Sequence, residues 1–230
     1  MGEKIMAKRP YFMISDTTDE FYKEFSCEFE FYTGFALSQK QKSVKSLHEQ
    51  ILKRYPERKI LEVSRRSENP LGIALSAFNL KFLNIDYKEY PVECVFQSSK
   101  VFSNGQQYKD LLYKTAKDAK TDERLKTSGP LVKFALNNFD WELEPKTYFY
   151  DFIYISALYR NKDVCKQLLD FDTFTDIEFN PQKSFNCQAR SVAIAVTLMK
   201  KNLIDKYLSD KKLFKKIYES HFQPEQQKLF

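Results

Sequence analysis

The sequence predicts a single helix-rich α+β domain with a small β element. Hydrophobic residues make up 43% of the 230 residues, with 21 Phe and 14 Tyr among them, which is enough to bury a sizeable core. Apolar residues recur at helical spacing in several long stretches, whereas alternation is confined to short segments. No internal repeat or low-complexity linker divides the chain, so one domain is the simplest organisation.

The N-terminal part of the chain predicts a strand followed by a helix. The segment CEFEFYTGF alternates apolar and polar residues, which is typical of a strand and here ends at Gly34. The next segment, SQKQKSVKSLHEQILKRYPERK, places apolar residues along one helical edge. We expect Ser38 or Ser43 to cap this helix and Pro56 to follow its end.

The middle of the chain predicts short β segments and then a helix with a polar face. KILEVSRRS is typical of a short strand, and SAFNLKFLNIDYKEYP of irregular or β structure. YPVECVFQSSKVF predicts a helix on which Glu93, Gln97 and Lys100 share one side. A polar stripe is ordinarily a solvated face, and the alternative is the wall of an active site. Periodicity alone does not distinguish the two.

The second half of the chain predicts mostly helix. TAKDAKTDERLKTS indicates a charged surface helix, and PKTYFYDFIYISALYRNKDVCKQLLDF indicates two core helices that break near Asn161. FTDIEFNP predicts a short strand with Asp176 and Glu178 on the same side. SFNCQARSVAIAVTLMK predicts a further helix, and the tail from Asp205 predicts a basic amphipathic helix.

Composition excludes several classes of site. Only 5 Gly occur, and they form no Gly-rich phosphate loop. The 4 Cys are scattered and only 2 His accompany them, so we expect neither a metal nor another cofactor. The sequence has no apolar stretch that could span a membrane and no signal-peptide pattern, so we expect a cytoplasmic protein without a membrane partner. The net charge of +6 permits a polyanionic substrate without requiring one.

Two motifs in the middle of the chain are SAFN and, after a short spacer, YPVECVFQSSKVF. Together they resemble the signature of the NADAR superfamily, which includes the YbiA-like proteins. In that signature a Ser-Asn-Phe motif precedes a Tyr-Pro-x-x-Glu-His-x-Phe-Gln-x-x-Lys-Phe block. Four later segments resemble further parts of the family in the same order: KTAKDAKTDERLKTSG, PKTYFYDFIYISALYRNKDVCKQLLDF, FTDIEFNP and SFNCQARSVAIAVTLMK.

The resemblance covers about residues 60–201, which we therefore expect to form a NADAR-like core of the YbiA type. Residues 1–59 are then an N-terminal extension packed on that core, and residues 202–230 a C-terminal basic amphipathic helix. Ala77 stands where the family usually has Asn, Cys94 replaces its His, and the Trp-Gly segment before the last helix is missing. The chain thus resembles a divergent, N-terminally extended branch, like the NADAR antitoxins associated with DarT-type toxins.

The resemblance implies cleavage of an N-glycosidic bond. Short family members act in riboflavin-pathway damage control, and branches beside DarT-type toxins remove ADP-ribose from guanine bases in DNA. The extension, the basic charge and the aromatic excess favour the second activity. The implied partners are ADP-ribosylated DNA or ADP-ribose, and a cognate DarT-type toxin. A small-metabolite N-glycosidase and a module that holds ADP-ribose or NAD without chemistry remain the alternatives.

The resemblance also implies catalytic residues. Glu93 matches the family Glu and would stabilise positive charge at the anomeric carbon or activate a nucleophile. Lys100 matches the family Lys and would attack that carbon and form a Schiff base after ring opening. Lys40, in the extension, is the rival for this role. Either lysine can instead bind phosphate or lie in solvent.

Further residues are expected to bind substrate, each with a plainer alternative. Glu178 matches a family Glu and, with Asp176, would bind ribose hydroxyls or transfer protons; the alternative is a pair that caps a helix. Phe78 and Phe96 would stack on a base, or belong to the core. The loop SRRS would bind pyrophosphate through Ser64, Arg65, Arg66 and Ser67, or be an ordinary polar turn. The remaining candidates are Asn79, Gln97, Asn186, Gln188 and Arg190, of which Asn186 is expected at a helix N-terminus that favours an anion.

Overall fold

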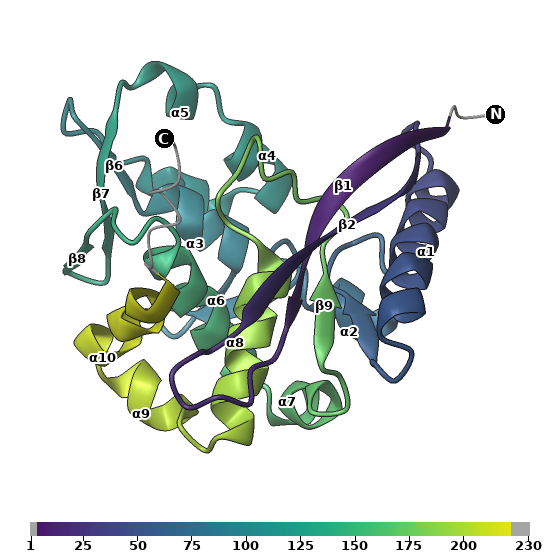
Figure 1. The fold of residues 1–230 in the computed structure, drawn as a ribbon. Helices are drawn as coiled ribbons and strands as arrows, with labels where there is room; N and C mark the ends of the chain where they lie inside the picture. The colour runs from purple at the N-terminus through teal and green to yellow at the C-terminus, as the bar shows by residue number, and fades with distance from the viewer. Residues whose placement is uncertain (1–3, 222–230) are drawn as a thin grey trace, which may run out of the picture.

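The computed structural model describes residues 4–221, with backbone only for Ser220 and His221, and it confirms the predicted α+β fold. The largest sheet has the strand order β2-β1-β9-β3 (Figure 1). Its strands are β1 (Lys4–Met13), β2 (Lys23–Tyr32), β9 (Thr173–Thr175) and β3 (Ile60–Glu62). β1 runs antiparallel to both β2 and β9, and β3 runs parallel to β9. Segments that are far apart in the sequence therefore share one sheet.

Two smaller sheets and the helices complete the fold. β4 (Lys81–Leu83) pairs with β5 (Glu89–Pro91), and β7 (Leu131–Leu136) pairs with both β6 (Lys100–Phe102) and β8 (Phe139–Trp141). No helix in the described part of the chain is long and apolar enough to cross a membrane. The helices are α1 (Leu37–Arg54), α2 (Pro70–Ala74), α3 (Val92–Ser98), α4 (Ala116–Thr121), α5 (Arg124–Thr127), α6 (Tyr148–Arg160), α7 (Lys162–Leu168), α8 (Gln188–Lys200), α9 (Ile204–Ser209) and α10 (Lys211–Lys215), with 3-10 turns at Lys109–Tyr113 and Lys216–His221.

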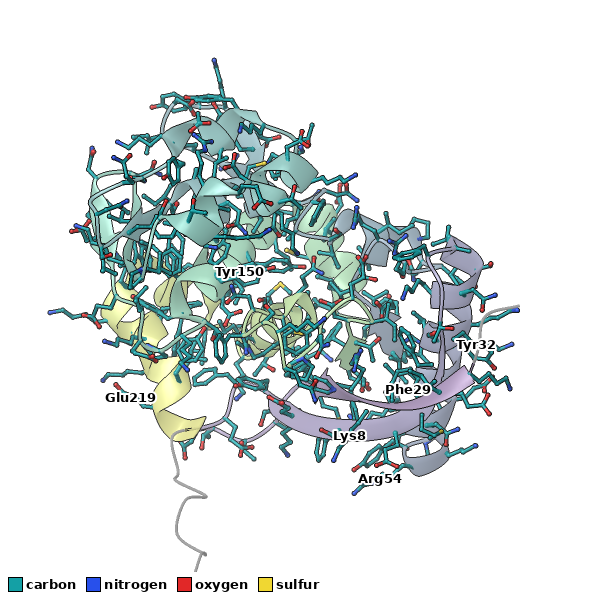
Figure 2. All side chains as sticks on the ribbon, turned by 90° about the horizontal axis from the view of Figure 1, so that it is seen from above. Lys8, Phe29, Tyr32, Arg54, Tyr150 and Glu219 are labelled. Carbon is teal, nitrogen blue, oxygen red and sulfur yellow. The ribbon has the colours of Figure 1, made fainter. Side chains whose placement is uncertain are left out.

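The two faces of strand β1 pack against different cores. Phe12 belongs to the main core, which surrounds α6 and α8, whereas Tyr11 and Met13 belong to a second core beneath α1. α1 and α8 accordingly lie on opposite sides of the β1–β2 hairpin (Figure 1). In Figure 2, Phe29 and Tyr32 mark β2 on one side of the molecule, and Tyr150 lies near its centre. Alternation along β1 thus joins the N-terminal segment to the rest of the core.

Helix α1 also closes the outer edge of the sheet. The hydroxyls of Ser43 and Ser46 accept hydrogen bonds from the backbone N–H groups of Tyr32 and Glu30, at 2.9 and 3.2 Å. Unpaired N–H groups on an edge strand invite pairing with another chain, so these bonds protect β2. The prediction that Ser38 or Ser43 caps α1 is wrong, because the N-cap is Ala36, which makes no side-chain bond.

Several predicted elements are shorter than expected. The helix predicted over residues 90–102 ends at Ser98, where the hydroxyls of Ser98 and Ser99 bond back to the Val95 carbonyl. Lys100 therefore lies in β6 and does not share a helical face with Glu93. The strand predicted in FTDIEFNP ends before Asp176, and the helix predicted from residue 184 begins at Gln188.

Two predicted single helices are each divided at an aspartate. The charged helix expected over residues 115–128 splits into α4 and α5, because Asp122 turns back to the backbone N–H and the guanidinium of Arg124. The tail splits at Asp210, whose carboxylate caps α10. Residues 222–230 of that tail lie outside the described part. The break between α6 and α7 at Asn161 is confirmed, and this side chain accepts from Val164 N.

A buried ionic cluster ties the C-terminal segment to the core. The Asp151 carboxylate on α6 is fully buried and accepts hydrogen bonds from Ser191 Oγ at 2.5 Å and from Tyr218 OH at 2.7 Å. Arg190 on α8 approaches the same carboxylate at 3.2 Å. The three donors come from α8 and from the last 3-10 turn. One carboxylate thus holds three distant segments together.

Replacing Asp151 with Asn should lower the free energy of unfolding by about 3 kcal/mol, because the buried Arg190 guanidinium loses its counter-charge. Denaturant titration of both proteins measures this loss. Asp163→Asn is the matched control, since its side chain is 87% exposed and its carboxylate is 4.0 Å from Lys166; we expect a change below about 0.5 kcal/mol. Equal losses in the two variants would contradict the structural role of Asp151.

Candidate functional site

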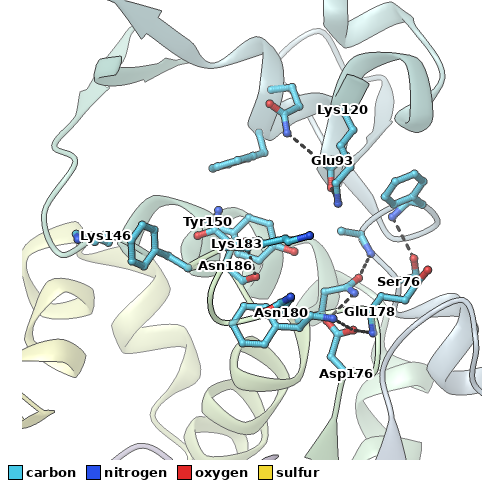
Figure 3. Close-up of a pocket in the computed structure, with 18 of the residues that line it drawn as sticks. Ser76, Glu93, Lys120, Lys146, Tyr150, Asp176, Glu178, Asn180, Lys183 and Asn186 are labelled. Atoms are coloured by element: carbon cyan, nitrogen blue, oxygen red, sulfur yellow. Dashed lines mark hydrogen bonds and ion pairs between the residues drawn. The ribbon is translucent and has the colours of Figure 1, made fainter. Parts of the chain in front are cut away.

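A cavity of about 630 Å³ opens between α3, α4, α6 and the segment between β9 and α8. Figure 3 shows Glu93 and Lys120 on one side of this cavity and Asp176 and Glu178 on the opposite side. Ten of the predicted site residues line it: Arg65, Phe78, Glu93, Phe96, Gln97, Lys100, Asp176, Glu178, Asn186 and Gln188. The volume falls within the range typical of sites for small ligands and cofactors.

Helix α3 places Glu93 at the cavity wall. The Glu93 backbone N–H donates to the Ala77 carbonyl at 2.9 Å, which ties the first turn of α3 to the SAFN segment. Glu93 is 6% exposed, and its carboxylate accepts from Gln97 Nε2, one turn later, at 2.7 Å. Lys120 Nζ lies 3.8 Å from the other carboxylate oxygen. The Gln97 amide, one helical turn along α3, and the Lys120 amine therefore hold the Glu93 carboxylate at the cavity.

The Lys100 amine lies in the same part of the cavity. Burial is the main cause that lowers the pKa of Lys100, and the charge of Lys120 adds to this effect, while Glu93 opposes it. The ammonium lies 5.0 Å from the centroid of the Phe96 ring. An amine with a lowered pKa is neutral in a larger fraction of molecules, and only the neutral amine is a nucleophile.

The aromatic candidates differ in their surroundings. Phe96 is buried and packs against Phe134 and Tyr150, with ring centroids 5.3 Å apart in both pairs. Its ring is thus part of the core and also one wall of the cavity. Phe78 is half-buried, with the Arg65 guanidinium 4.1 Å and the Lys120 ammonium 5.3 Å from its ring centroid. The face of an aromatic ring attracts cations, so both contacts are electrostatically favourable.

The opposite wall is acidic and rigidly held. Asp176 is 5% exposed, and its Oδ2 accepts from Gln188 Nε2 at 3.0 Å. The other end of the Gln188 amide accepts from Ala77 N at 2.5 Å. Glu178 pairs with Arg66 at 3.1 Å and with Arg65 at 3.4 Å. Gln188 therefore connects the acidic wall to the SAFN segment that also holds Glu93.

Three predicted substrate-binding residues, Ser64, Ser67 and Asn79, do not line the cavity. Ser64 Oγ donates to Glu62 at 2.6 Å, and Ser67 Oγ accepts from Asn69 N at 3.1 Å, so both are buried parts of the turn. The Asn79 amide donates to the Ile73 carbonyl at 2.9 Å. Of the four residues in the SRRS loop, only Arg65 lines the cavity.

Lys40 and Arg190 also lie outside the cavity wall. The Lys40 ammonium lies 4.6 Å from the Phe31 ring centroid, at the start of α1. Arg190 is buried, pairs with Asp151 and donates to the Phe185 carbonyl at 3.2 Å. Arg190 therefore holds the segment before α8, and cavity residues belong to that segment. The Arg190 guanidinium itself does not line the cavity.

Three lysines that line the cavity were not predicted from the sequence. Lys120, Lys146 and Lys183 are exposed at its rim. The α4 charges were interpreted as a solvated face, and β7, which places Phe134 in the wall, was not predicted at all. With Arg65 and Lys100, these lysines bring five cationic side chains to a cavity with three carboxylates. In the described residues no group of His, Cys, Asp and Glu is arranged to hold a metal ion.

Two amide oxygens at the cavity are buried without a hydrogen-bond partner in the described part of the chain. They are Oε1 of Gln97 and Oδ1 of Asn186. A buried acceptor without a donor is costly, and native structures rarely retain one. A ligand that presents hydroxyl or N–H groups would satisfy both oxygens.

The cavity therefore brings together carboxyl groups, cations, amides and aromatic rings, and its Glu93 wall is the motif that resembles the NADAR superfamily. The model of the DarT1-associated NADAR antitoxin family matches residues 7–228. This chain belongs to that family. The match confirms the NADAR assignment and includes β2 and α1, so most of the segment expected to be an extension belongs to the pattern of this family. A search of curated proteins found no match.

Glu93→Gln should lower the pKa of Lys100 further, by up to about one unit, because the carboxylate that opposes the effect of burial is lost. Lys120→Met is the matched control. It should raise the pKa of Lys100, because the Lys120 charge lowers that pKa. NMR titration of methylated lysines reports both shifts. Shifts of the same sign in the two variants would contradict the described electrostatics.

Proposed function

We propose that this NADAR protein is an N-glycosidase that removes ADP-ribose from guanine bases in DNA. The observation that carries the proposal is the buried Glu93 carboxylate beside the Lys100 amine at one cavity wall. Cleavage of a ribose–nitrogen bond develops positive charge at the anomeric carbon, which a nearby carboxylate stabilises. The family match supports this assignment through the antitoxin class to which the chain belongs.

The proposed reaction passes through a covalent intermediate on Lys100. The neutral amine attacks the anomeric carbon, and the electron pair of the ribose–nitrogen bond leaves with guanine, which takes up a proton. The ribose ring opens, the amine loses its proton and a Schiff base forms. Water then adds to the Schiff base and releases ADP-ribose, which restores the amine. Division of one difficult step into two easier steps is the benefit of such an intermediate.

The cavity lining matches the remaining parts of ADP-ribose. Arg65 and the rim lysines 120, 146 and 183 offer positive charge to a diphosphate. The unpartnered oxygens of Gln97 and Asn186 accept from ribose hydroxyls or base N–H groups. Phe78 offers a ring face to a base.

Basic residues outside the cavity favour a nucleic-acid substrate over a small metabolite. Arg66, which pairs with Glu178 at the cavity, and Arg9 both lower the pKa of Lys40, after the larger effect of burial. Arg9 and Lys40 both lie over the Phe31 ring, at 5.8 and 4.6 Å from its centroid. Cations interleaved with an aromatic ring are typical of surfaces that bind single-stranded nucleic acid. The modified DNA is accordingly the proposed substrate, and a DarT1-type toxin the proposed source of the modification.

The first test measures ADP-ribose release from a single-stranded oligonucleotide that carries ADP-ribosylated guanine. An oligonucleotide with ADP-ribosylated thymine and a small ADP-ribosylated guanosine are the comparison substrates. We expect release from both guanine substrates, faster from the oligonucleotide, and none from thymine. Glu93→Gln should reduce the rate at least about 100-fold, while binding of ADP-ribose is retained.

The outcomes separate the alternative functions. Release from the small guanosine alone would indicate a small-metabolite glycosidase. Tight ADP-ribose binding without release from any substrate would indicate a binding module and would overturn the proposed activity. An unchanged rate in the Glu93 variant would exclude this carboxylate from the chemistry.

Borohydride reduction distinguishes the two candidate lysines. Reduction during turnover should attach ADP-ribose covalently to the wild-type protein and to Lys40→Met, because a Schiff base on Lys100 becomes a stable amine. Lys100→Met should form no adduct, as judged by intact-protein mass spectrometry. An adduct that is lost only in Lys40→Met would assign the nucleophile to the N-terminal segment instead.

A further inference from the structure

A second carboxyl group, that of Glu62, lies close enough to Asp176 to interact with it electrostatically. Glu62 ends β3, which pairs in parallel with β9 so that Glu62 lies opposite Thr175, the residue before Asp176. Glu62 is 2% exposed and Asp176 is 5% exposed, but only Asp176 lines the cavity. Two neighbouring strand ends therefore bring two carboxyl groups together in a region with almost no access to water.

Glu62 has the hydrogen bonds of an ionised carboxylate. It accepts from Ser64 Oγ at 2.6 Å, from Thr175 Oγ1 at 2.7 Å and from Ile177 N at 2.9 Å. Since the Thr175 hydroxyl donates to Glu62, its oxygen accepts from His48 Nε2, at 2.8 Å. Burial lowers the pKa of His48 to about 4, so this imidazole is a neutral donor. Three short bonds to one buried group favour its charged form.

Asp176 is held less tightly. Its Oδ1 accepts from the backbone N–H groups of Glu178 and Phe179 at 3.0 and 3.1 Å, and its Oδ2 accepts only from Gln188 at 3.0 Å. A proton on Oδ2 is compatible with all of these bonds, because that oxygen still has a lone pair for Gln188.

No cation compensates this pair in the described part of the chain, where neither Glu62 nor Asp176 makes an ion pair. The other titratable groups around Asp176 are Glu178, Tyr150, Tyr154 and Cys187. The pKa values of the tyrosines and of Cys187 are raised well above the ordinary ones by burial, so these groups are neutral. The charge of Glu178 is balanced by Arg65 and Arg66. Glu178 also raises the pKa of Asp176, but by less than Glu62, which has no cationic partner among the described residues.

We propose that Glu62 is a positioning residue whose negative charge keeps Asp176 protonated at neutral pH, so that Asp176 presents an acid to the cavity. The role of this acid rests on the proposed function. As the ribose–nitrogen bond breaks, its electron pair stays on the guanine nitrogen, and the Asp176 proton moves to the guanine. Asp176 is left as a carboxylate and takes a proton from water before the next turnover.

The electrostatics of the pair agree with this geometry. Burial is the main cause that raises the pKa of Asp176 to about 7, and the charge of Glu62 is the next. Burial also raises the pKa of Glu62, but its three hydrogen bonds oppose that effect. Because Asp176 must carry its proton to act, the rate should fall as pH rises through about 7.

The experiment compares pH–rate profiles for ADP-ribose release by wild-type protein, Glu62→Gln and Asp176→Asn. Without the Glu62 charge, Asp176 should ionise at lower pH, so the falling limb should move down by about one pH unit. Asp176→Asn should lose this limb and about 100-fold of the rate at pH 6. Glu89→Gln, at an exposed position in β5, is the control and should leave the profile unchanged. A Glu62→Gln profile that is merely lower at every pH would overturn the proposal.

A second measurement needs neither activity nor a stable Glu62 variant. Carboxyl-carbon NMR of the wild-type protein should show an aspartate resonance that titrates near pH 7 and is absent in Asp176→Asn. The absence of an aspartate that titrates above about pH 5.5 would overturn the proposal. If the wild-type protein releases no ADP-ribose, the proposed function fails and this titration alone decides whether Asp176 holds a proton.

Discussion

The pairing of β9 between β1 and β3 is the constraint on which the site depends. β9 has only three residues, all buried, yet it bonds to strands from two separate parts of the chain. Its end releases Asp176 and Glu178 toward the cavity, and β3 ends beside it with Glu62 and the SRRS loop. The acidic wall is therefore a product of long-range strand pairing, whereas the Glu93 wall is built by one local helix.

The carboxylates at the site are held in different ways, and this separates their chemistry. Glu93 has an amide and a more distant amine as partners, so its charge faces the cavity. Glu178 is neutralised by two arginines. Asp176 has only neutral donors and an anionic neighbour behind it. Groups of one type can act as electrostatic stabiliser, structural pair and proton donor when their environments differ in this way.

Local patterns predicted the parts of the site that lie in one motif. The spacing in YPVECVFQSSKVF identified Glu93, Gln97 and Lys100 together, although Lys100 reaches the cavity from a strand and not from the helix. Lys120 was missed because a lysine on a charged helix looks the same whether or not a cavity lies beside it. Glu62 was missed for a different reason: it stands alone in an apolar strand, and only the parallel pairing with β9 reveals its neighbour. Contacts across the chain are not encoded in periodicity.

The position of β1 has a consequence for shortened versions of this protein. A chain that starts near residue 60 would retain the NADAR motifs but would leave β9 as an open edge strand. It would also uncover the apolar groups that pack on Tyr11 and Phe12 from either side of the sheet. An uncovered edge beside an apolar face is the arrangement that promotes aggregation. The motif-bearing segment is consequently a poor choice for a minimal expressed domain, even though it contains most of the cavity wall.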